Sequence, residues 1–223
     1  KRQPWAGISR TNWILTNIDK SPKISDAKKT QYKGEAHFLR GLYYFNLVRL
    51  FGDVPWIDKQ QTASDDLQVS RTSKDIVYQH IIDDFSDAAS MLPAVYENTT
   101  DIGRATKGAA FGLLAKVYLT LKRYNETLVA IDSVTNLGVY SLNRKYEWNF
   151  SDLRENGPES LFEVQYEKDV TAYSEFDILG QGGWHHEYMA PLASINIGGP
   201  WGNFGWFAVY PEFVESYEPG DLR

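Results

Sequence analysis

The residues best suited to ligand chemistry lie in one stretch near the end of this 223-residue chain. Between Tyr173 and Tyr210 there are nine aromatic residues and seven glycines in 38 positions, without a sustained helical or strand period. Long irregular segments are usually functional or disordered, and a high content of rings argues against disorder. An aromatic face offers a rigid apolar plane to the C–H face of a sugar, and nearby polar groups bind its hydroxyls. The candidate ligand-binding residues are Trp184, His185, Tyr188, Trp201, Phe204 and Trp206.

Other uses of the same stretch are also open. The rings could instead cover the open end of a helical stack and touch no ligand. His185-His186-Glu187 lacks the i, i+4 histidine pair of a His-Glu-x-x-His zinc site, and no third ligand is evident. The glycines at 180–183 are not followed by a lysine, so a phosphate-binding loop is not expected. We therefore predict no metal site and no cofactor.

Carboxylates for a glycoside hydrolase are present but cannot be placed. Such an enzyme needs two carboxyl groups about 5 to 9.5 Å apart, and Asp177, Glu187 and Glu212 could supply them. In a chain with 29 acidic residues such a pair has little meaning. The prediction is a protein that is not an enzyme.

Charge and composition exclude several classes of function. The chain has 23 Lys and Arg against 29 Asp and Glu, a net charge of -6, and no basic block, so nucleic-acid binding has little electrostatic support. With no cysteine, disulfides, thiolate nucleophiles and Cys-ligated metals are excluded. No stretch approaches the roughly 20 apolar residues of a membrane span. The sequence starts at Lys1 without a signal peptide, so we expect an internal piece of a longer protein, with any membrane anchor upstream.

The elements that must position the aromatic stretch are predicted to be helices. Residues 5–19 have one apolar helical face with Asn12 on it, and a buried Asn12 needs hydrogen-bond partners, expected to be backbone groups of an adjacent helix. A second helix should run from Asp26, which can cap it, to Phe51, ended by Gly52 and Pro55.

This second helix is apolar around most of its circumference. Its narrow polar strip consists of Lys33, His37, Arg40 and Tyr44. Such a helix should be packed by neighbours on at least two sides. Glu35 and Arg40 are interpreted as fold determinants, and their spacing of five does not make them a direct pair.

Three further helices are expected before residue 140. Thr72-x-x-Asp75 resembles a capping box that opens one of them, and the apolar stripe of that helix is Val77, Ile81, Phe85, Ala88 and Leu92. The next begins at Arg104 and carries small residues on one side, Gly108, Gly112 and Ala115, so that a neighbour can approach closely. The last runs over 126–137, with Gly138 as its C-terminal cap.

Helix pairs joined by short turns predict a mainly α fold of tetratricopeptide-like repeats, with four or five helices. Beyond residue 140 an irregular, loop-rich region should carry one or two short strands, best placed at 160–167, where Phe162, Val164 and Tyr166 alternate. We divide the chain into a helical-repeat core at 1–140 and a loop-rich, aromatic-rich region at 141–223.

Several segments carry a resemblance to a known family, including residues 8–15, 114–119 and 220–223 and the three described next. Residues 35–55, with Glu35-Ala36-x-Phe38-Leu39-Arg40 at one end and Phe51-Gly52-Asp53-Val54-Pro55 at the other, resemble the signature helix of the SusD/RagB family. Residues 103–106 and 156–164 resemble the same family. The resemblance implies a lipid-anchored protein of the outer membrane and cell surface that binds oligosaccharide or polysaccharide. It implies, too, that loops after the repeats contribute to the glycan site.

The resemblance further implies a SusC-like TonB-dependent transporter as partner, to which the glycan is passed. On this interpretation the chain meets the membrane only through an anchor outside the sequence given. Two alternatives from other classes stay open: a helical-repeat scaffold that binds a peptide or protein, and, with less support, a glycoside hydrolase.

Overall fold

The computed structural model describes residues 3–62, 64–65, 68–165 and 215. The chain divides into two compact units, Lys1–Val164 and Gln165–Arg223. All the elements described below belong to the first unit.

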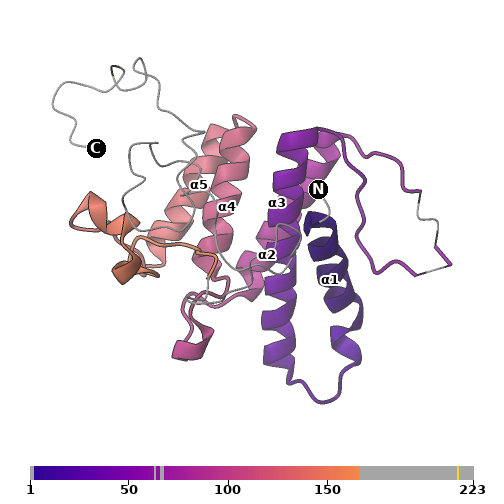
Figure 1. The fold of residues 1–223 in the computed structure, drawn as a ribbon, viewed down its shortest axis with the longest axis horizontal. Helices are drawn as coiled ribbons and strands as arrows, with labels where there is room; N and C mark the ends of the chain where they lie inside the picture. Colours follow the sequence, from indigo (N-terminus) through magenta and orange to yellow (C-terminus); the bar gives the residue numbers. More distant parts are fainter. Residues whose placement is uncertain (1–2, 63, 66–67, 166–214, 216–223) are drawn as a thin grey trace, which may run out of the picture. The chain divides into compact units, whose positions relative to one another are not determined.

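Five α-helices follow one another in this unit, and each packs against the next (Figure 1). They are α1 (Gln3–Asn17), α2 (Asp26–Phe51), α3 (Lys74–Met91), α4 (Lys107–Thr120) and α5 (Tyr124–Asn136). Short 3-10 helices are η1 (Ile18–Lys20), η2 (Thr99–Asp101), η3 (Tyr146–Phe150) and η4 (Asp152–Arg154). The mainly helical fold predicted from the sequence is confirmed.

The helix starts differ from the predicted ones by a few residues. Ser25 caps α2, with its Oγ accepting a hydrogen bond from the backbone N–H of Lys28 at 3.4 Å, so that Asp26 is the first helical residue and not the cap. Likewise, α4 begins at Lys107 rather than Arg104, because the Thr106 Oγ1 accepts from the backbone N–H of Ala109 at 3.1 Å. The end of α2 is as predicted, since Gly52 adopts a positive φ of 67° there.

The capping box predicted at Thr72 is wrong. Ser73 is the N-cap residue of α3. Thr72 instead pairs with Val54 in an isolated antiparallel bridge, where its backbone N–H donates to the Val54 carbonyl at 3.0 Å. Its hydroxyl also accepts from the backbone N–H of Trp56 at 3.3 Å. Thr72 therefore ties the chain after α2 to the chain before α3.

The core lies on both sides of α2, which packs against α1 and α3. Phe38, Tyr44 and Phe45 are fully buried, as is the predicted stripe of α3 from Val77 to Leu92. Half of the polar strip of α2 is buried with the apolar residues, namely Arg40 and Tyr44, whereas Lys33 and His37 are partly exposed. The prediction that α2 is packed on at least two sides is confirmed.

The segment after α5 packs on the small residues of α4. A Cβ added to Gly108 would collide with the Tyr140 ring, and one added to Gly112 would lie 2.6 Å from Leu161 Cδ1. The close neighbour predicted from these small residues is therefore present, and it is this following segment. Phe162 reaches the core, where its ring centroid lies 4.9 Å from that of Phe38.

The predicted strand at 160–167 is wrong for the residues that the structure describes. Residues 160–165 form no strand, and the part of the chain described here contains only the isolated bridge at Val54. The Ser160 N–H is used in a turn, where it donates to the Gly157 carbonyl at 3.0 Å. Val164 is 64% exposed although Phe162 is packed inside, so the alternation does not mark one buried face.

Candidate functional site

The six aromatic and histidine residues predicted to bind ligand, Trp184 to Trp206, all lie outside the described residues. So do the candidate carboxylates Asp177, Glu187 and Glu212. These assignments stay predictions. What the structure describes is the helical platform, its buried polar clusters and two hollows formed by the segment after α5.

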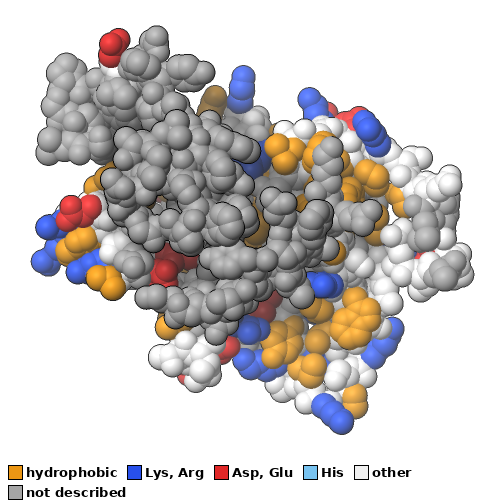
Figure 2. Space-filling model, viewed as in Figure 1, with side chains coloured by type: hydrophobic (Ala, Val, Ile, Leu, Met, Phe, Trp, Pro, Cys, Tyr) orange, Lys and Arg blue, Asp and Glu red, His pale blue; other side chains and the backbone are white. Residues whose placement is uncertain are grey.

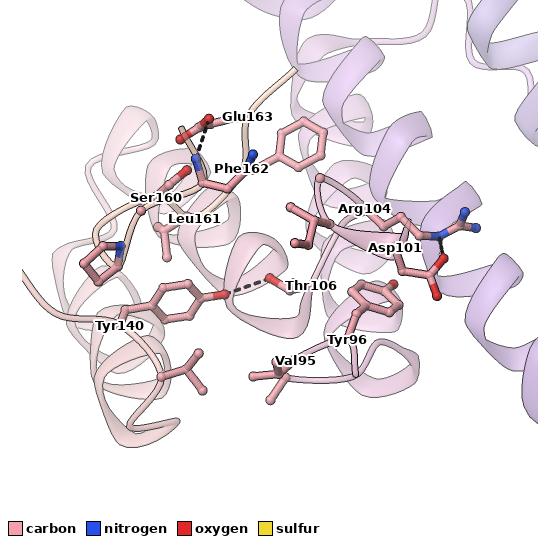
Figure 3. Close-up of a pocket in the computed structure, with 17 residues that line it drawn as sticks. Val95, Tyr96, Asp101, Arg104, Thr106, Tyr140, Ser160, Leu161, Phe162 and Glu163 are labelled. Atoms are coloured by element: carbon pink, nitrogen blue, oxygen red, sulfur yellow. Dashed lines mark hydrogen bonds and ion pairs between the residues drawn. The ribbon is translucent and has the colours of Figure 1, made fainter. Parts of the chain in front are cut away.

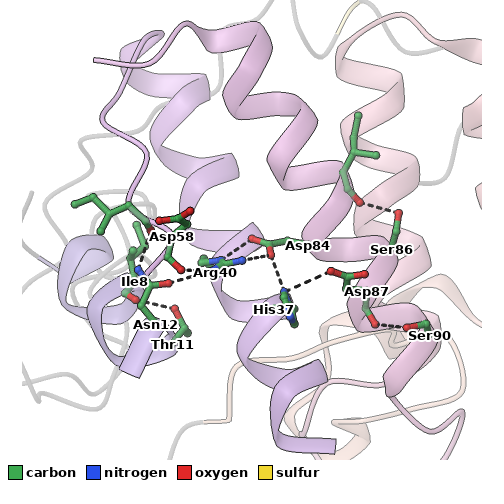
Figure 4. Close-up of polar contacts among 12 residues, drawn as sticks. Ile8, Thr11, Asn12, His37, Arg40, Asp58, Asp84, Ser86, Asp87 and Ser90 are labelled. Atoms are coloured by element: carbon green, nitrogen blue, oxygen red, sulfur yellow. Dashed lines mark hydrogen bonds and ion pairs between the residues drawn. The ribbon is translucent and has the colours of Figure 1, made fainter. Parts of the chain in front are cut away.

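A buried polar cluster is centred on Arg40 of α2 (Figure 4). Its guanidinium makes two hydrogen bonds to the Asp84 carboxylate of α3, from Nε to Oδ2 at 2.9 Å and from Nη2 to Oδ1 at 2.7 Å. His37 Nδ1 lies 2.7 Å from Asp84 Oδ1. Paired charges with this geometry satisfy each other where water is excluded. Both residues that bind the Asp84 carboxylate therefore belong to α2.

The other side of the same guanidinium faces α1 and the loop after α2 (Figure 4). Arg40 Nη1 donates to Asn12 Oδ1 and to the Asp58 carbonyl, both at 3.0 Å, and Asn12 Nδ2 donates to the Ile57 carbonyl at 2.7 Å. Asn12 is thus structural, as predicted, although its partners are an arginine side chain and a loop carbonyl. The cluster joins α1, α2, α3 and residues 57–58.

A second ion pair fixes the loop before α4. Arg104 donates from Nε to Glu35 Oε1 at 2.9 Å and from Nη2 to Glu35 Oε2 at 2.7 Å. The Tyr96 hydroxyl donates to the Ala105 carbonyl at 2.8 Å and to Glu35 Oε1 at 3.2 Å. Burial, with the Glu35 charge adding to it, raises the pKa of Tyr96 above its ordinary value. Glu35 and Arg40 are therefore fold determinants with separate partners.

The apolar hollow lies between the loop at 94–106, Tyr140 and residues 156–163, with a volume of about 260 Å³ (Figure 3). Val95, Leu161 and Phe162 contribute its apolar wall. Its polar groups bind one another: the hydroxyls of Tyr140 and Thr106 are 2.8 Å apart, and Arg104 is held by Glu35. Because these groups are already paired, the apolar hollow has little to offer a hydroxyl-rich ligand.

The Trp148 hollow is larger, about 400 Å³, and shares Gly157 and residues 160–163 with the apolar hollow. Its remaining lining is mostly polar: Asn143, Trp148, Asn149, Arg154 and Glu159. The sequence predictions did not include this hollow. The available signal was Tyr146-Glu147-Trp148-Asn149-Phe150, with three rings in five residues.

Other kinds of site find no support in the described part. No three His, Asp or Glu side chains among the described residues gather as metal ligands would. Among the described helices, none has the length and apolar character needed to cross a membrane. On the face in Figure 2, the basic and acidic side chains of the described residues are scattered between apolar ones.

Comparison with known proteins shows which family this chain resembles. Residues 2–119 match the SusD-like family described as "Starch-binding associating with outer membrane". A SusD-like protein of Formosa agariphila is 26% identical over 194 residues, which are 82% of this chain and 37% of that protein. The chain spans less than half of the length of each curated relative that it matches.

Solved structures agree with the sequence match. A SusD superfamily protein from Parabacteroides distasonis is similar over 99% of this chain and 46% of its own, with a TM-score of 0.84 and 29% identity. A laminarin-binding SusD-like protein is similar over 74% of this chain and 38% of its own, with a TM-score of 0.67 and 29% identity. The match to the family covers more than half of the residues, and the helical stack is the one its members share: the chain belongs to the SusD-like family.

Proposed function

We propose that this chain is part of a cell-surface protein that binds oligosaccharide or polysaccharide for uptake and does not cleave it. The observation that carries the proposal is the match of residues 2–119 to a starch-binding family. The similarity to a laminarin-binding protein supports the same class of ligand. The proposed location is the outer membrane, by a lipid anchor, with a SusC-like TonB-dependent transporter as the partner that receives the glycan.

The helical stack serves as the platform of this protein. Asp84 and Glu35 are each held by an arginine through two hydrogen bonds, so neither carboxyl group is available as a general acid or base. The side chains of these clusters bind one another and position the helices. This supports a binding role rather than a catalytic one for the helical stack.

The proposed contacts are Trp184, His185, Tyr188, Trp201, Phe204 and Trp206, which follow the platform in the chain. Their rings suit the C–H faces of pyranoses, and the histidine can bind a hydroxyl. Large aromatic side chains commonly dominate binding energy where they are buried by a ligand.

Calorimetric titration with maltoheptaose and with laminarin tests the proposal, beside an assay for new reducing ends. We expect saturable binding without release of reducing ends. In the variant Trp184→Ala/Trp201→Ala/Trp206→Ala we expect affinity to fall about tenfold or more, since ring contacts of this kind contribute roughly 2 kcal/mol.

Trp13→Ala is the matched control, because Trp13 is 57% exposed on α1 and belongs to no proposed site. Unchanged affinity in the triple variant contradicts the site. Release of reducing ends supports the glycoside hydrolase instead, and no binding of either glycan supports the scaffold for a peptide or protein.

A further inference from the structure

We propose that the Trp148 hollow is a second saccharide-binding site, which takes one pyranose unit of a neutral glycan. The inference rests on the proposed function only for the class of ligand, because every residue that forms the hollow differs from the six aromatic and histidine contacts proposed above. Its volume of about 400 Å³ lies within the range of small-molecule sites, about 300 to 1,000 Å³.

The polar wall of the hollow is preorganised. Glu159 Oε2 accepts hydrogen bonds from the backbone N–H of Asn143 at 2.9 Å and from Asn149 Nδ2 at 3.2 Å. Asn143 Nδ2 donates to Asn149 Oδ1 at 2.6 Å. The Ser141 N–H donates to the Pro158 carbonyl at 3.0 Å and holds the two sides of the loop together. Side chains fixed in this way lose little freedom when a ligand binds.

Two groups in the wall retain hydrogen-bonding capacity. Arg154 stacks on the Trp148 ring, with Cζ 3.7 Å from the ring centroid, and its side chain makes no hydrogen bond or ion pair with the described residues. Glu159 Oε1 accepts no hydrogen bond from them, since both bonds to this carboxylate end on Oε2. A planar donor fork and a carboxylate acceptor in one hollow match adjacent sugar hydroxyls, each of which both donates and accepts.

Charge indicates a neutral rather than an acidic sugar. Glu159 lines the hollow together with the guanidinium of Arg154, and its Oε1 accepts no hydrogen bond from the described residues. An anionic ligand, such as a uronic acid or a sulfated sugar, would meet the carboxylate of Glu159 beside Arg154. A neutral pyranose avoids this repulsion and still uses the Arg154 donors.

Exposed rings continue from the hollow along the same 3-10 helix. Tyr146 is 57% and Phe150 74% exposed, and their ring centroids are 5.2 Å apart. Both flank Trp148 in η3 (Tyr146–Phe150). They extend the apolar surface next to the polar wall, which suits a glycan longer than one sugar. The apolar hollow lacks this combination, because its polar groups are paired.

The test follows the indole N–H signals of the seven tryptophans by nitrogen-15 NMR during titration with maltose and with laminaribiose. Trp148→Phe identifies the Trp148 signal. The variants Trp184→Phe, Trp201→Phe and Trp206→Phe identify the signals of the three tryptophans among the proposed glycan contacts. We expect the Trp148 signal to shift saturably with at least one of the two sugars.

Arg154→Ala should weaken the affinity reported by this signal about tenfold, as expected for losing hydrogen bonds from a charged donor. Arg154 is exposed, so this variant retains the fold, and Arg144→Ala, an exposed arginine that does not line the hollow, should leave the affinity unchanged.

The outcomes separate this site from the proposed function. Shifts at Trp184, Trp201 or Trp206 with a constant Trp148 signal overturn the Trp148 site and leave the proposed function standing. A saturable shift at Trp148 with the other three constant supports the Trp148 site and contradicts the proposed contacts. A Trp148 affinity that is equal in Arg154→Ala, or no shift of any tryptophan, overturns the inference.

Discussion

Arg40 is the central residue of the buried polar cluster in the helical unit. It is 8% exposed and binds Asp84 on one side and Asn12 on the other. A buried ion pair adds little net stability compared with apolar residues, but removing one partner leaves the other charge uncompensated. The effect of the cluster on the free energy of unfolding is therefore large only when one partner is removed.

Asp84→Ala should lower the free energy of unfolding by about 3–5 kcal/mol, because it leaves the Arg40 guanidinium buried without its carboxylate. Urea denaturation followed by far-UV circular dichroism measures the change. Asp87→Ala is the control: its side chain is 55% exposed and lies 3.9 Å from His37, so a change within about 0.5 kcal/mol is expected. Equal losses in the two variants would contradict the role given to the cluster.

At the residue scale the sequence predicted a structural role for Asn12 and Arg40 but not their partners. Asn12 was identified because an amide on an apolar helical face must be paired. Asp84 lies 44 positions from Arg40, on another helix, and local spacing carries no information about such a contact. The partner depends on the register between α2 and α3, which packing sets.

At the element scale, contact between α2 and α3 depends on the absence of a side chain at Gly34. A Cβ at this position would lie 2.9 Å from the Met91 Cβ and 3.0 Å from Leu92 Cδ2. The first of these atoms is attached directly to the backbone, so the clash cannot be relieved by turning a side chain. The two helices approach closely here.

Gly34→Ala should therefore destabilise the protein by about 1–3 kcal/mol through overpacking, although alanine favours a helix interior over glycine by about 1 kcal/mol. Thermal and urea unfolding measure whether the variant is less or more stable than the unmodified protein. Thr30→Ala, at an exposed position of the same helix, should be neutral or slightly stabilising. A stabilised Gly34→Ala variant would contradict this prediction, because it would show that α2 and α3 can move apart enough to accept a Cβ at this position.

The helices were predictable because their apolar period extends over many residues, as the stripe from Val77 to Leu92 shows. Caps were less certain because neighbouring residues, such as Ser25 and Asp26, can both serve, and tertiary contacts decide. The strand at 160–167 failed for another reason. Alternation predicts a strand only if a partner strand supplies hydrogen bonds, and residues 160–165 pack on α4 through Leu161 instead.

At the scale of the whole molecule, three phenols with a raised pKa make stability depend on alkaline pH: the buried Tyr44 and Tyr78 and the half-buried Tyr96. Burial is the main cause that raises the pKa of Tyr44, and burial with the Glu35 charge raises the pKa of Tyr96. Below the unfolded value of about 10, both states hold these protons and the stability is fully present. Above it the unfolded chain loses protons that the folded protein retains, so stability falls as pH rises.

The urea midpoint should thus fall above about pH 10, and the fall should be shallower in Tyr96→Phe, which has lost one of these three groups. A series of urea transitions between neutral and alkaline pH measures this slope. Tyr124→Phe, at a position 60% exposed, should retain the slope of the unmodified protein. Parallel slopes in all three proteins would refute the linkage.

The candidate sites differ in how far the sequence could locate them. Trp184 to Trp206 form a local excess of rings and glycines, which composition alone makes visible. The Trp148 hollow forms because Glu159 accepts a hydrogen bond from the Asn143 backbone N–H. It also requires the segment after α5 to pack on α4 at Gly108 and Gly112. Such a wall forms only from contacts distant in sequence, so the three rings at 146–150 were its only local trace.

The Arg40 cluster has one more consequence, for errors in folding. The apolar patterns of neighbouring repeats are similar, so helices could pair in a wrong register with little loss of apolar contact. If α3 slid along α2 by the turn that brings Ile81 opposite Arg40, no carboxylate would replace that of Asp84. That arrangement buries a lone cation and costs several kcal/mol. The pair of Arg40 and Asp84 thereby disfavours this misaligned packing of α3 on α2.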